Sequence, residues 1–585
     1  MDAQGKSIFD AAVRDHRAGQ LELAVTGYRN VLKRDQTNRQ ARNNLAVALR
    51  ALGRSAEAER LYAQMLNEQP EDETTCGNLI NLLIGTRRPR DALAALTQCA
   101  AAVSDRGKPE AAERLYRRGL QIDPNEPVLH NNLGNALLLL KRPQEALACF
   151  DRALQLNPRY RRALTNKARA LTALNQLEDA LEHYRRAADL DPNDHTNLHD
   201  LALSLKQLGR LDEARPLFDK VLTLKPDFLP SLIEYSRIKK LEADTPHFQS
   251  LLKHAQNIQR VVPDVRPVLL FSIAKGYNDS KRYEEAITTA LRGAASHRLQ
   301  IKYDEKQVEA FYALVRESFS KELFEKTEGV GDPDATPVFI LGMPRSGTTL
   351  TDQIIVSHPQ GASLGETDQL RRMWNSFLAA KARPLNSATI AAIEPGDFAA
   401  AGQSYVAEMH ANAGGGARIV EKEPSNFGRV GLIHLLLPQA KILHCVRNPV
   451  DTCVSCLFQK FHDDAQGWSY ELGELGRYFR GYLQMMDHWR EVLPGRIMDV
   501  VYEETIADQE AQTRRILEFI GLPWDDACLD FHKTDRPVLT SSIGQVRRPI
   551  YKDSMERWRR YERHLGPLFE ALGPDVLDRF GVRPS

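Results

Sequence analysis

A segment at residues 338–355, VFILGMPRSGTTLTDQII, combines the residue types that bind a phosphate-like anion. A short apolar run ends in a glycine-containing loop, and a helical stretch follows. The first backbone N–H groups of a helix have no partner within the helix, and the helix dipole favours negative charge there. Hydroxyl side chains and the planar fork of an arginine add further donors. The residues expected to bind the anion are Arg345, Ser346, Gly347, Thr348 and Thr349.

This loop differs from the Walker A pattern of ordinary nucleotide-binding proteins, which places a lysine directly after the second glycine of Gly-x-x-x-x-Gly. Gly342 and Gly347 have that spacing, but Thr348 stands at the lysine position. The sequence shows no clear second carboxylate motif for Mg²⁺. A P-loop kinase is therefore the less favoured alternative, and no metal is expected.

The string PRSGTT (344–349) resembles the 5'-phosphosulfate loop of sulfotransferases, above all the tyrosylprotein sulfotransferases. The resemblance extends over residues 335–565. It implies an enzyme that moves a sulfuryl group from the co-substrate 3'-phosphoadenosine-5'-phosphosulfate (PAPS) to an acceptor hydroxyl. The acceptor implied by that family is a protein tyrosine, with a carbohydrate or a small molecule as the alternative.

A second match lies in KILHCVRNPVDTCVSCLFQKF (441–461). The family has an arginine after a strand and a serine eight residues later, and both bind the 3'-phosphate. Arg447 and Ser455 fit that spacing. The tyrosylprotein enzymes carry a further arginine four residues after the serine, where this chain has Gln459 followed by Lys460, and whether Lys460 replaces that arginine is open.

Two later segments extend the resemblance on the donor side. VYEET (501–505) is similar to a strand-end segment of the family, and TSSIGQVRRPIYKDSMERW (540–558) is similar to a segment that lines the cofactor. The donor-binding residues implied by these matches are Tyr502, Ser542, Gln545, Val546, Arg548 and Arg557.

The resemblance also implies the catalytic groups. Glu366, in LGETDQL, matches the glutamate that acts as base, whereas without the resemblance it reads as a helix cap. Lys422, in VEKEPSNF, would neutralise charge on the bridging oxygen and the sulfate, whereas alone it reads as a surface lysine in a charged run. Arg345 and Ser542 complete the expected catalytic set.

Short apolar runs and helical stretches must hold these residues in place. The runs at 338–341, 441–446 and 496–502 are each followed by polar or helical segments. Strands that alternate with helices predict a parallel sheet with helices on both faces.

The N-terminal half repeats with a period of 34 residues. Small residues at this period, with proline after the second helix, are typical of tetratricopeptide repeats. The interval between Ala92 and Ala112 is shorter, which indicates either a truncated repeat or a boundary between two blocks. The alanines that carry the period are Ala24, Ala58 and Ala92, then Ala112, Ala146, Ala180 and Ala214.

We therefore expect an α-superhelical tetratricopeptide array followed by an α/β, P-loop-type sulfotransferase domain with a parallel sheet. The expected divisions are repeats over 1–226, an irregular helical extension of the array over 227–325, a linker at 326–337 and the sulfotransferase domain over 338–585.

Composition favours an ordinary globular protein, with 42% hydrophobic residues and a formal net charge of +1 over 585 residues. That charge gives no reason to expect nucleic acid as a partner. The N-terminus lacks the pattern of a signal peptide, no apolar run approaches a membrane span, and the seven cysteines are scattered, so we expect a cytoplasmic protein. Cys453 and Cys456 are expected to be small core residues rather than metal ligands.

A tetratricopeptide array presents a concave surface lined by its first helices. Asn44, Asn131 and Asn135 are expected on that surface, where their amides would bind a protein or peptide acceptor or an adaptor. The alternative is that these asparagines only bridge neighbouring repeats, and a scaffold without catalysis is a further alternative. The oligomeric state is open.

Overall fold

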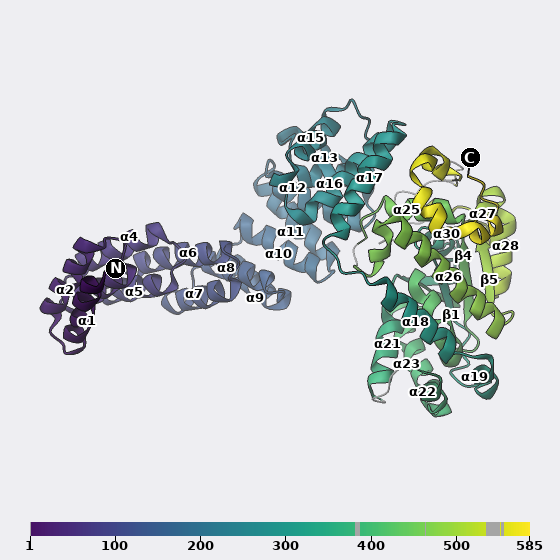
Figure 1. The fold of residues 1–585 in the computed structure, drawn as a ribbon, viewed down its shortest axis with the longest axis horizontal. Coiled ribbons are helices and arrows are strands. Elements are labelled where there is room, and N and C mark those ends of the chain that lie inside the picture. Colours follow the sequence, from purple (N-terminus) through teal and green to yellow (C-terminus); the bar gives the residue numbers. More distant parts are fainter. Residues whose placement is uncertain (1, 381–385, 462–463, 534–549, 551–554, 585) are drawn as a thin grey trace. The chain divides into compact units, whose positions relative to one another are not determined.

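The computed structural model describes residues 2–380, 386–461, 464–533, 550 and 555–584 (Figure 1). The chain folds into two compact units, an N-terminal unit of residues 1–204 and a C-terminal unit of residues 205–585. The helices of the N-terminal unit are α1 (Ala3–Arg17), α2 (Leu21–Arg34), α3 (Arg39–Ala51), α4 (Ser55–Glu68), α5 (Glu73–Gly85), α6 (Pro89–Asp105), α7 (Pro109–Ile122), α8 (Pro127–Leu139), α9 (Pro143–Leu156), α10 (Arg161–Ala173), α11 (Leu177–Leu190) and most of α12 (His195–Gln207).

Small residues at the helix crossings explain the period of the repeats. Ala146 in α9 and Ala180 in α11 are fully buried in the second helices of their pairs. Gly134 in α8 lies so close to the Phe150 ring that a Cβ atom there would be 2.5 Å from Cε1. Paired helices thus approach closely, and each pair buries its apolar face against the next pair. The expected tetratricopeptide array is confirmed.

The short interval between Ala92 and Ala112 corresponds to a repeat that lacks its first helix. Ala92 lies in α6 and Ala112 lies in α7, and only residues 106–108 separate these two helices. α6 packs against both α5 and α7. α6 is thus the second helix of its own repeat, and it packs against α7 where the missing first helix would lie, which identifies a truncated repeat within a continuous array.

One asparagine expected on the open concave surface is used inside the array. Asn131 is 1% exposed, and its Oδ1 accepts a hydrogen bond from Asn166 Nδ2 of the next repeat at 2.9 Å. The prediction that Asn131 faces a ligand is wrong, because a buried amide must satisfy its polar atoms within the protein. Asn44 and Asn135 are half-buried.

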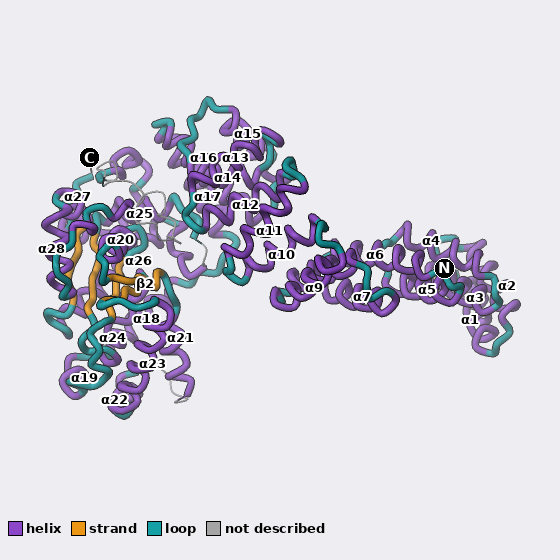
Figure 2. Tube along the Cα trace, turned by 180° about the vertical axis from the view of Figure 1, so that it is seen from behind, coloured by secondary structure: helices purple, strands orange, loops and turns teal. Residues whose placement is uncertain are grey.

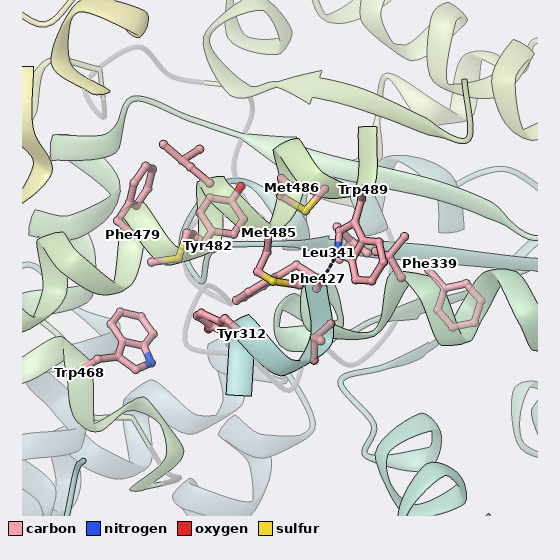
Figure 3. Packing of buried hydrophobic residues seen from close by; sticks show 14 of the residues in the cluster. Tyr312, Phe339, Leu341, Phe427, Trp468, Phe479, Tyr482, Met485, Met486 and Trp489 are labelled. Carbon is pink, nitrogen blue, oxygen red and sulfur yellow. Dashed lines mark hydrogen bonds between the residues drawn. The ribbon is translucent and has the colours of Figure 1, made fainter. Parts of the chain in front are cut away.

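A series of α-helices precedes the sheet in the C-terminal unit. They are α13 (Leu211–Leu224), α14 (Leu229–Ile238), α15 (Pro246–Gln256), α16 (Arg266–Asp279), α17 (Tyr283–Arg298), α18 (Glu305–Ser318) and α19 (Lys321–Lys326). Residues of the last four of them, α16 to α19, belong to the apolar core of the sheet. Figure 3 shows Tyr312 of α18 among Phe427, Tyr482 and Met485, with its ring centroid 5.8 Å from that of Phe427. Asp332 N, in the segment expected to be a linker, donates to Leu436 O at 2.8 Å. Residues before and after the expected linker therefore belong to one apolar core.

A five-stranded parallel sheet forms the centre of the C-terminal unit, as expected for this fold class (Figure 2). Its strand order is β2-β3-β1-β4-β5. The sequence indicated the positions of β1, β4 and β5, while β2 and β3 are too mixed in composition to stand out. The strands are β1 (Pro337–Gly342), β2 (Gly361–Gly365), β3 (Arg418–Lys422), β4 (Lys441–Val446) and β5 (Ile497–Val501).

Helices connect these strands and cover both faces of the sheet. On β1, Val338 and Ile340 pack in one apolar cluster with Ile516 of α28, whereas Phe339 and Leu341 pack in another cluster. Within the described residues, no helix combines the length and the apolar character that crossing a bilayer requires. The connecting and C-terminal helices are α20 (Thr348–Val356), α21 (Gln369–Ala380), α22 (Ser387–Ala391), α23 (Pro395–Ala413), α24 (Val430–Leu436), α25 (Pro449–Leu457), α26 (Leu472–Val492), α27 (Tyr502–Ala507), α28 (Gln509–Ile520), the 3₁₀ helix η7 (Arg557–His564) and α30 (Gly566–Arg579).

Candidate functional site

All five strands are parallel, so their carboxyl ends meet at one edge of the sheet, where ligands bind in open α/β sheets. Each strand delivers at least one of the expected site residues to that edge. In strand order from β2 to β5 these are Glu366 after β2, Lys422 at the end of β3, the loop 343–347 after β1, Arg447 after β4 and Tyr502 after β5.

The loop between β1 and α20 has the backbone geometry of an anion-binding turn. Gly342 and Gly347 have φ values of 143° and 107°, and Arg345 has a φ of 71°. A Cβ atom at Gly347 would be 2.9 Å from Cδ2 of Tyr502, so glycine is required there on both counts. α20 begins at Thr348, and its first N–H groups have no acceptor within the helix.

Two arginines connect this loop to the residues after β4. Arg345 Nε donates to Ser455 Oγ at 3.0 Å, and Ser455 lies in α25. Arg447 Nη1 donates to the carbonyl of Arg345 at 3.0 Å. The Arg447 guanidinium also lies 4.6 Å from the centre of the Tyr502 ring. Four residues chosen from three stretches of sequence are therefore linked by direct contacts.

Glu366 and Lys422 form an ion pair at the same edge. The Lys422 side chain is 1% exposed and that of Glu366 is 45% exposed. The pairing register shifts between Ser363 and Gly365, and Gly365 has a φ of 72°, so the chain turns just before Glu366. Lys422 is thus not a surface lysine. Glu366 is not a helix cap either, because α21 begins only at Gln369.

Sequence reasoning missed Glu421, the buried neighbour of Lys422. Its carboxylate accepts hydrogen bonds from the Tyr405 hydroxyl and, at 2.8 Å, from Asn426 Nδ2. Thr367, the residue after Glu366, also hydrogen-bonds to it. Burial raises the pKa of the Glu421 carboxyl to about 7. Strand alternation could have indicated that Glu421 is buried, because it places the side chains of residues 421 and 422 on opposite faces of the sheet.

Glu421 therefore joins the end of β3 to the loop after β2. Its own strand carries Lys422, and its partner Thr367 follows Glu366 directly. A buried carboxyl with several hydrogen bonds fixes the groups around it, since leaving any one of them unsatisfied is costly. These hydrogen bonds hold Lys422 and Glu366 in position to form their ion pair.

The remaining expected donor residues come from the C-terminal part of the chain. Ser542, Gln545, Val546 and Arg548 lie outside the described residues. Arg557 is described at the start of η7, where its guanidinium lies 5.7 Å from the centre of the Phe458 ring, next to the end of α25. It lies beside the helix that carries Ser455. The replacement of the family arginine by Lys460 stays a hypothesis.

Cys453 and Cys456 are buried in α25. Burial raises the pKa of both thiols, that of Cys456 to about 12. A neutral thiol is a poor metal ligand and a poor nucleophile. Both cysteines therefore act as packing residues of the helix that carries Ser455.

Both parts of the chain match known protein families. Residues 337–526 match the sulfotransferase family model, and tetratricopeptide repeat models match residues 5–103, 127–160, 162–194 and 195–228. An uncharacterised protein of Aquifex aeolicus is 32% identical over 361 residues, which are 60% of this chain and 47% of that protein.

Two animal enzymes are also similar to this chain. Protein-tyrosine sulfotransferase A of Caenorhabditis elegans is 27% identical over 266 residues, covering 42% of this chain and 67% of the relative. The protein-tyrosine sulfotransferase of Drosophila melanogaster is 28% identical over 260 residues, covering 41% of this chain and 51% of the relative. The chain thus spans about half the length of the Aquifex and Drosophila relatives.

Proposed function

Since residues 337–526 form a domain of the sulfotransferase family and tetratricopeptide repeats precede it, we propose that the chain transfers a sulfuryl group from PAPS to a protein tyrosine hydroxyl. The observation that carries the proposal is the Lys422–Glu366 pair at the sheet edge that also holds the anion loop. A buried ammonium beside a half-exposed carboxylate suits a reaction that must both stabilise an anion and remove a proton.

The donor would be bound by two sets of groups. The N–H groups that open α20, with Arg345, would bind the 5'-phosphosulfate, and Arg447 and Ser455 would bind the 3'-phosphate. Support comes from the Arg345–Ser455 and Arg447–Arg345 hydrogen bonds, which hold both sets together. Arginine suits phosphate because its planar fork donates two parallel hydrogen bonds.

Glu366 would accept the proton of the acceptor hydroxyl as its oxygen attacks sulfur. The bond between sulfur and the bridging oxygen breaks, and its electron pair goes to the phosphate. Lys422 and Arg345 would stabilise the charge that develops there. Lys422 is paired with Glu366, so a donor anion that attracts Lys422 would break this ion pair. The Glu366 carboxylate would then be free to act as the base.

Transfer of labelled sulfate from PAPS to tyrosine peptides and to carbohydrates tests the reaction and the acceptor. Glu366→Gln should lower kcat by at least about 10²-fold, the usual contribution of a positioned base. Lys422→Met should lower kcat by a similar factor through the loss of charge stabilisation in the transition state. Lys441→Met, at the opposite end of β4, and Glu408→Gln, on the surface of α23, are matched controls. Full turnover in Glu366→Gln would exclude that residue as the base, and transfer to carbohydrate alone would exclude tyrosine.

Donor identity is tested separately by ligand stabilisation. The product 3'-phosphoadenosine-5'-phosphate (PAP) should raise Tm, because a ligand that binds only the folded state stabilises it by mass action. Arg447→Ala should weaken PAP binding by roughly one to two decades, the effect of losing a charged hydrogen bond. A larger Tm increase with ATP and Mg²⁺ would favour the kinase alternative.

The repeats would recruit the protein acceptor or an adaptor. Support comes from the array itself, since tetratricopeptide repeats offer an extended concave surface. Asn135→Ala in the full chain should raise KM for a protein acceptor and leave KM for a short tyrosine peptide unchanged. A fragment starting near Asp332 is unsuitable for this test, because it would remove Tyr312 and Phe319 from the core of the C-terminal unit. Equal KM values for the protein acceptor would contradict recruitment through this surface.

A further inference from the structure

The hairpin of α16 and α17, which belongs to the helical extension, contacts η7 near the C-terminus. The Tyr561 hydroxyl donates to Asn278 Oδ1 at 2.5 Å. The Tyr561 and Tyr283 rings meet edge to face, with their centroids 6.1 Å apart. His564 Nε2 lies 2.8 Å from Glu284 Oε1. η7 is thus anchored to both helices of the hairpin, α16 and α17, which are labelled in Figure 1.

η7 also contacts α25, the helix of Ser455. Trp558 N donates to Asp451 Oδ1 at 2.9 Å, and the centroids of the Phe458 and Tyr561 rings are 5.2 Å apart. Tyr561 is 1% exposed and lies between α16 and α25. The Tyr561 side chain therefore contacts both the helical extension and the residue that directly follows the helix of Ser455.

Together these contacts form a continuous series. Asn278 accepts a hydrogen bond from Tyr561, Tyr561 packs on Phe458 directly after α25, and Ser455 of α25 accepts the hydrogen bond of Arg345. Arg557, the first residue of η7, lies over the Phe458 ring. Each link lies within the C-terminal unit.

η7 needs this support because its own structure is weak. A 3₁₀ helix has strained hydrogen bonds and is rarely stable beyond a few residues. Glu556, which precedes η7, has a φ of 49°, a conformation that non-glycine residues adopt only when the surroundings impose it. A buried tyrosine hydroxyl also requires a partner. Tertiary contacts with α16 and α17 therefore decide where η7 lies.

We propose that Tyr561 and Asn278 are positioning residues for the sulfuryl donor, through which the α16–α17 hairpin braces η7 and α25 against the anion loop. This inference rests on the proposed function. Neither side chain touches the reacting groups. They act by fixing Arg557 and the helix of Ser455, so their loss should weaken donor binding more than turnover.

Binding of PAP to the full chain, measured by calorimetry, tests the inference. Asn278→Ala and Tyr561→Phe should each weaken PAP by about tenfold, the effect of one lost buried hydrogen bond. KM for PAPS should rise in parallel, with kcat at saturation within about threefold of wild type. Asn278→Asp keeps the acceptor oxygen and should retain wild-type affinity. Tyr561→Phe keeps the ring, so it remains informative if Asn278→Ala does not fold.

Arg298→Gln is the matched control. Arg298 joins the same helix α17 to Glu474 of α26 through two 2.8 Å hydrogen bonds, without contact to η7. It should leave PAP affinity unchanged. Wild-type PAP affinity in both Asn278→Ala and Tyr561→Phe, or equal weakening in Arg298→Gln, would overturn the inference alone. Absence of PAP binding by the wild-type chain would overturn the proposed function together with it.

Discussion

The buried carboxyl of Glu421 gives the C-terminal unit a specific dependence of stability on pH. The pKa of Glu421 is raised from 4.5 to about 7, chiefly because burial disfavours the charged form. In the unfolded chain the carboxyl returns to its ordinary pKa. Between these two values the folded state binds the proton and the unfolded state does not, so stability falls as pH rises through this range.

The magnitude follows from the two pKa values. A separation of about 2.5 corresponds to a loss of about 3 kcal/mol of unfolding free energy between pH 4.5 and pH 8. Glu421→Gln removes the ionisation and keeps a side chain of the same size that can hydrogen-bond to Asn426. The variant should therefore gain about 3 kcal/mol relative to wild type over the same pH range.

Urea unfolding at pH 4.5, 6 and 8 measures this difference. All five tryptophans, which are Trp374, Trp468, Trp489, Trp524 and Trp558, lie in the C-terminal unit, so tryptophan fluorescence follows that unit. Glu408→Gln, an exposed carboxyl on the same helix as Tyr405, is the control and should show a much smaller pH dependence. A free-energy difference between Glu421→Gln and wild type that is constant across the three pH values would refute the reasoning.

Two glycine substitutions test the backbone geometry of each unit. Gly347→Ala should destabilise the protein by roughly 1–3 kcal/mol because residue 347 has a positive φ, and chemical denaturation measures this loss. It should also abolish PAP binding, because the new Cβ would displace Tyr502 from the loop, and calorimetry measures this effect. Gly134→Ala should destabilise the repeat array by roughly 1–3 kcal/mol, because its Cβ would overlap the Phe150 ring; circular dichroism during thermal unfolding measures this loss.

Each of these substitutions has a matched control. Gly495 has a φ of 74° but nothing within 4 Å of an added Cβ, so Gly495→Ala should cost only about 1 kcal/mol and leave PAP affinity intact. Gly85, the last residue of α5, also has open space, and Gly85→Ala should be neutral or stabilising by up to about 1 kcal/mol. Equal losses in a variant and its control would contradict the steric argument.

The amino-acid sequence alone indicated the features that depend on local pattern. The 34-residue recurrence of alanine predicted the repeats, because paired helices need a small residue at each crossing. PRSGTT after an apolar run predicted a strand, an anion loop and a helix, since glycine conformation and helix N-termini are local properties. The alternation of strands and helices predicted the parallel sheet.

Only the tertiary structure decided which groups meet. Glu421 and Lys422 are neighbours in a charged run, yet strand alternation and burial give one a raised pKa and the other an ion pair with Glu366. The sequence places Asn131 on a ligand-binding surface, but its amide oxygen accepts a hydrogen bond from Asn166 of the next repeat. Tyr561 contacts Asn278, 283 residues away along the chain. Such partners are set by packing between distant segments, which a local sequence pattern does not encode.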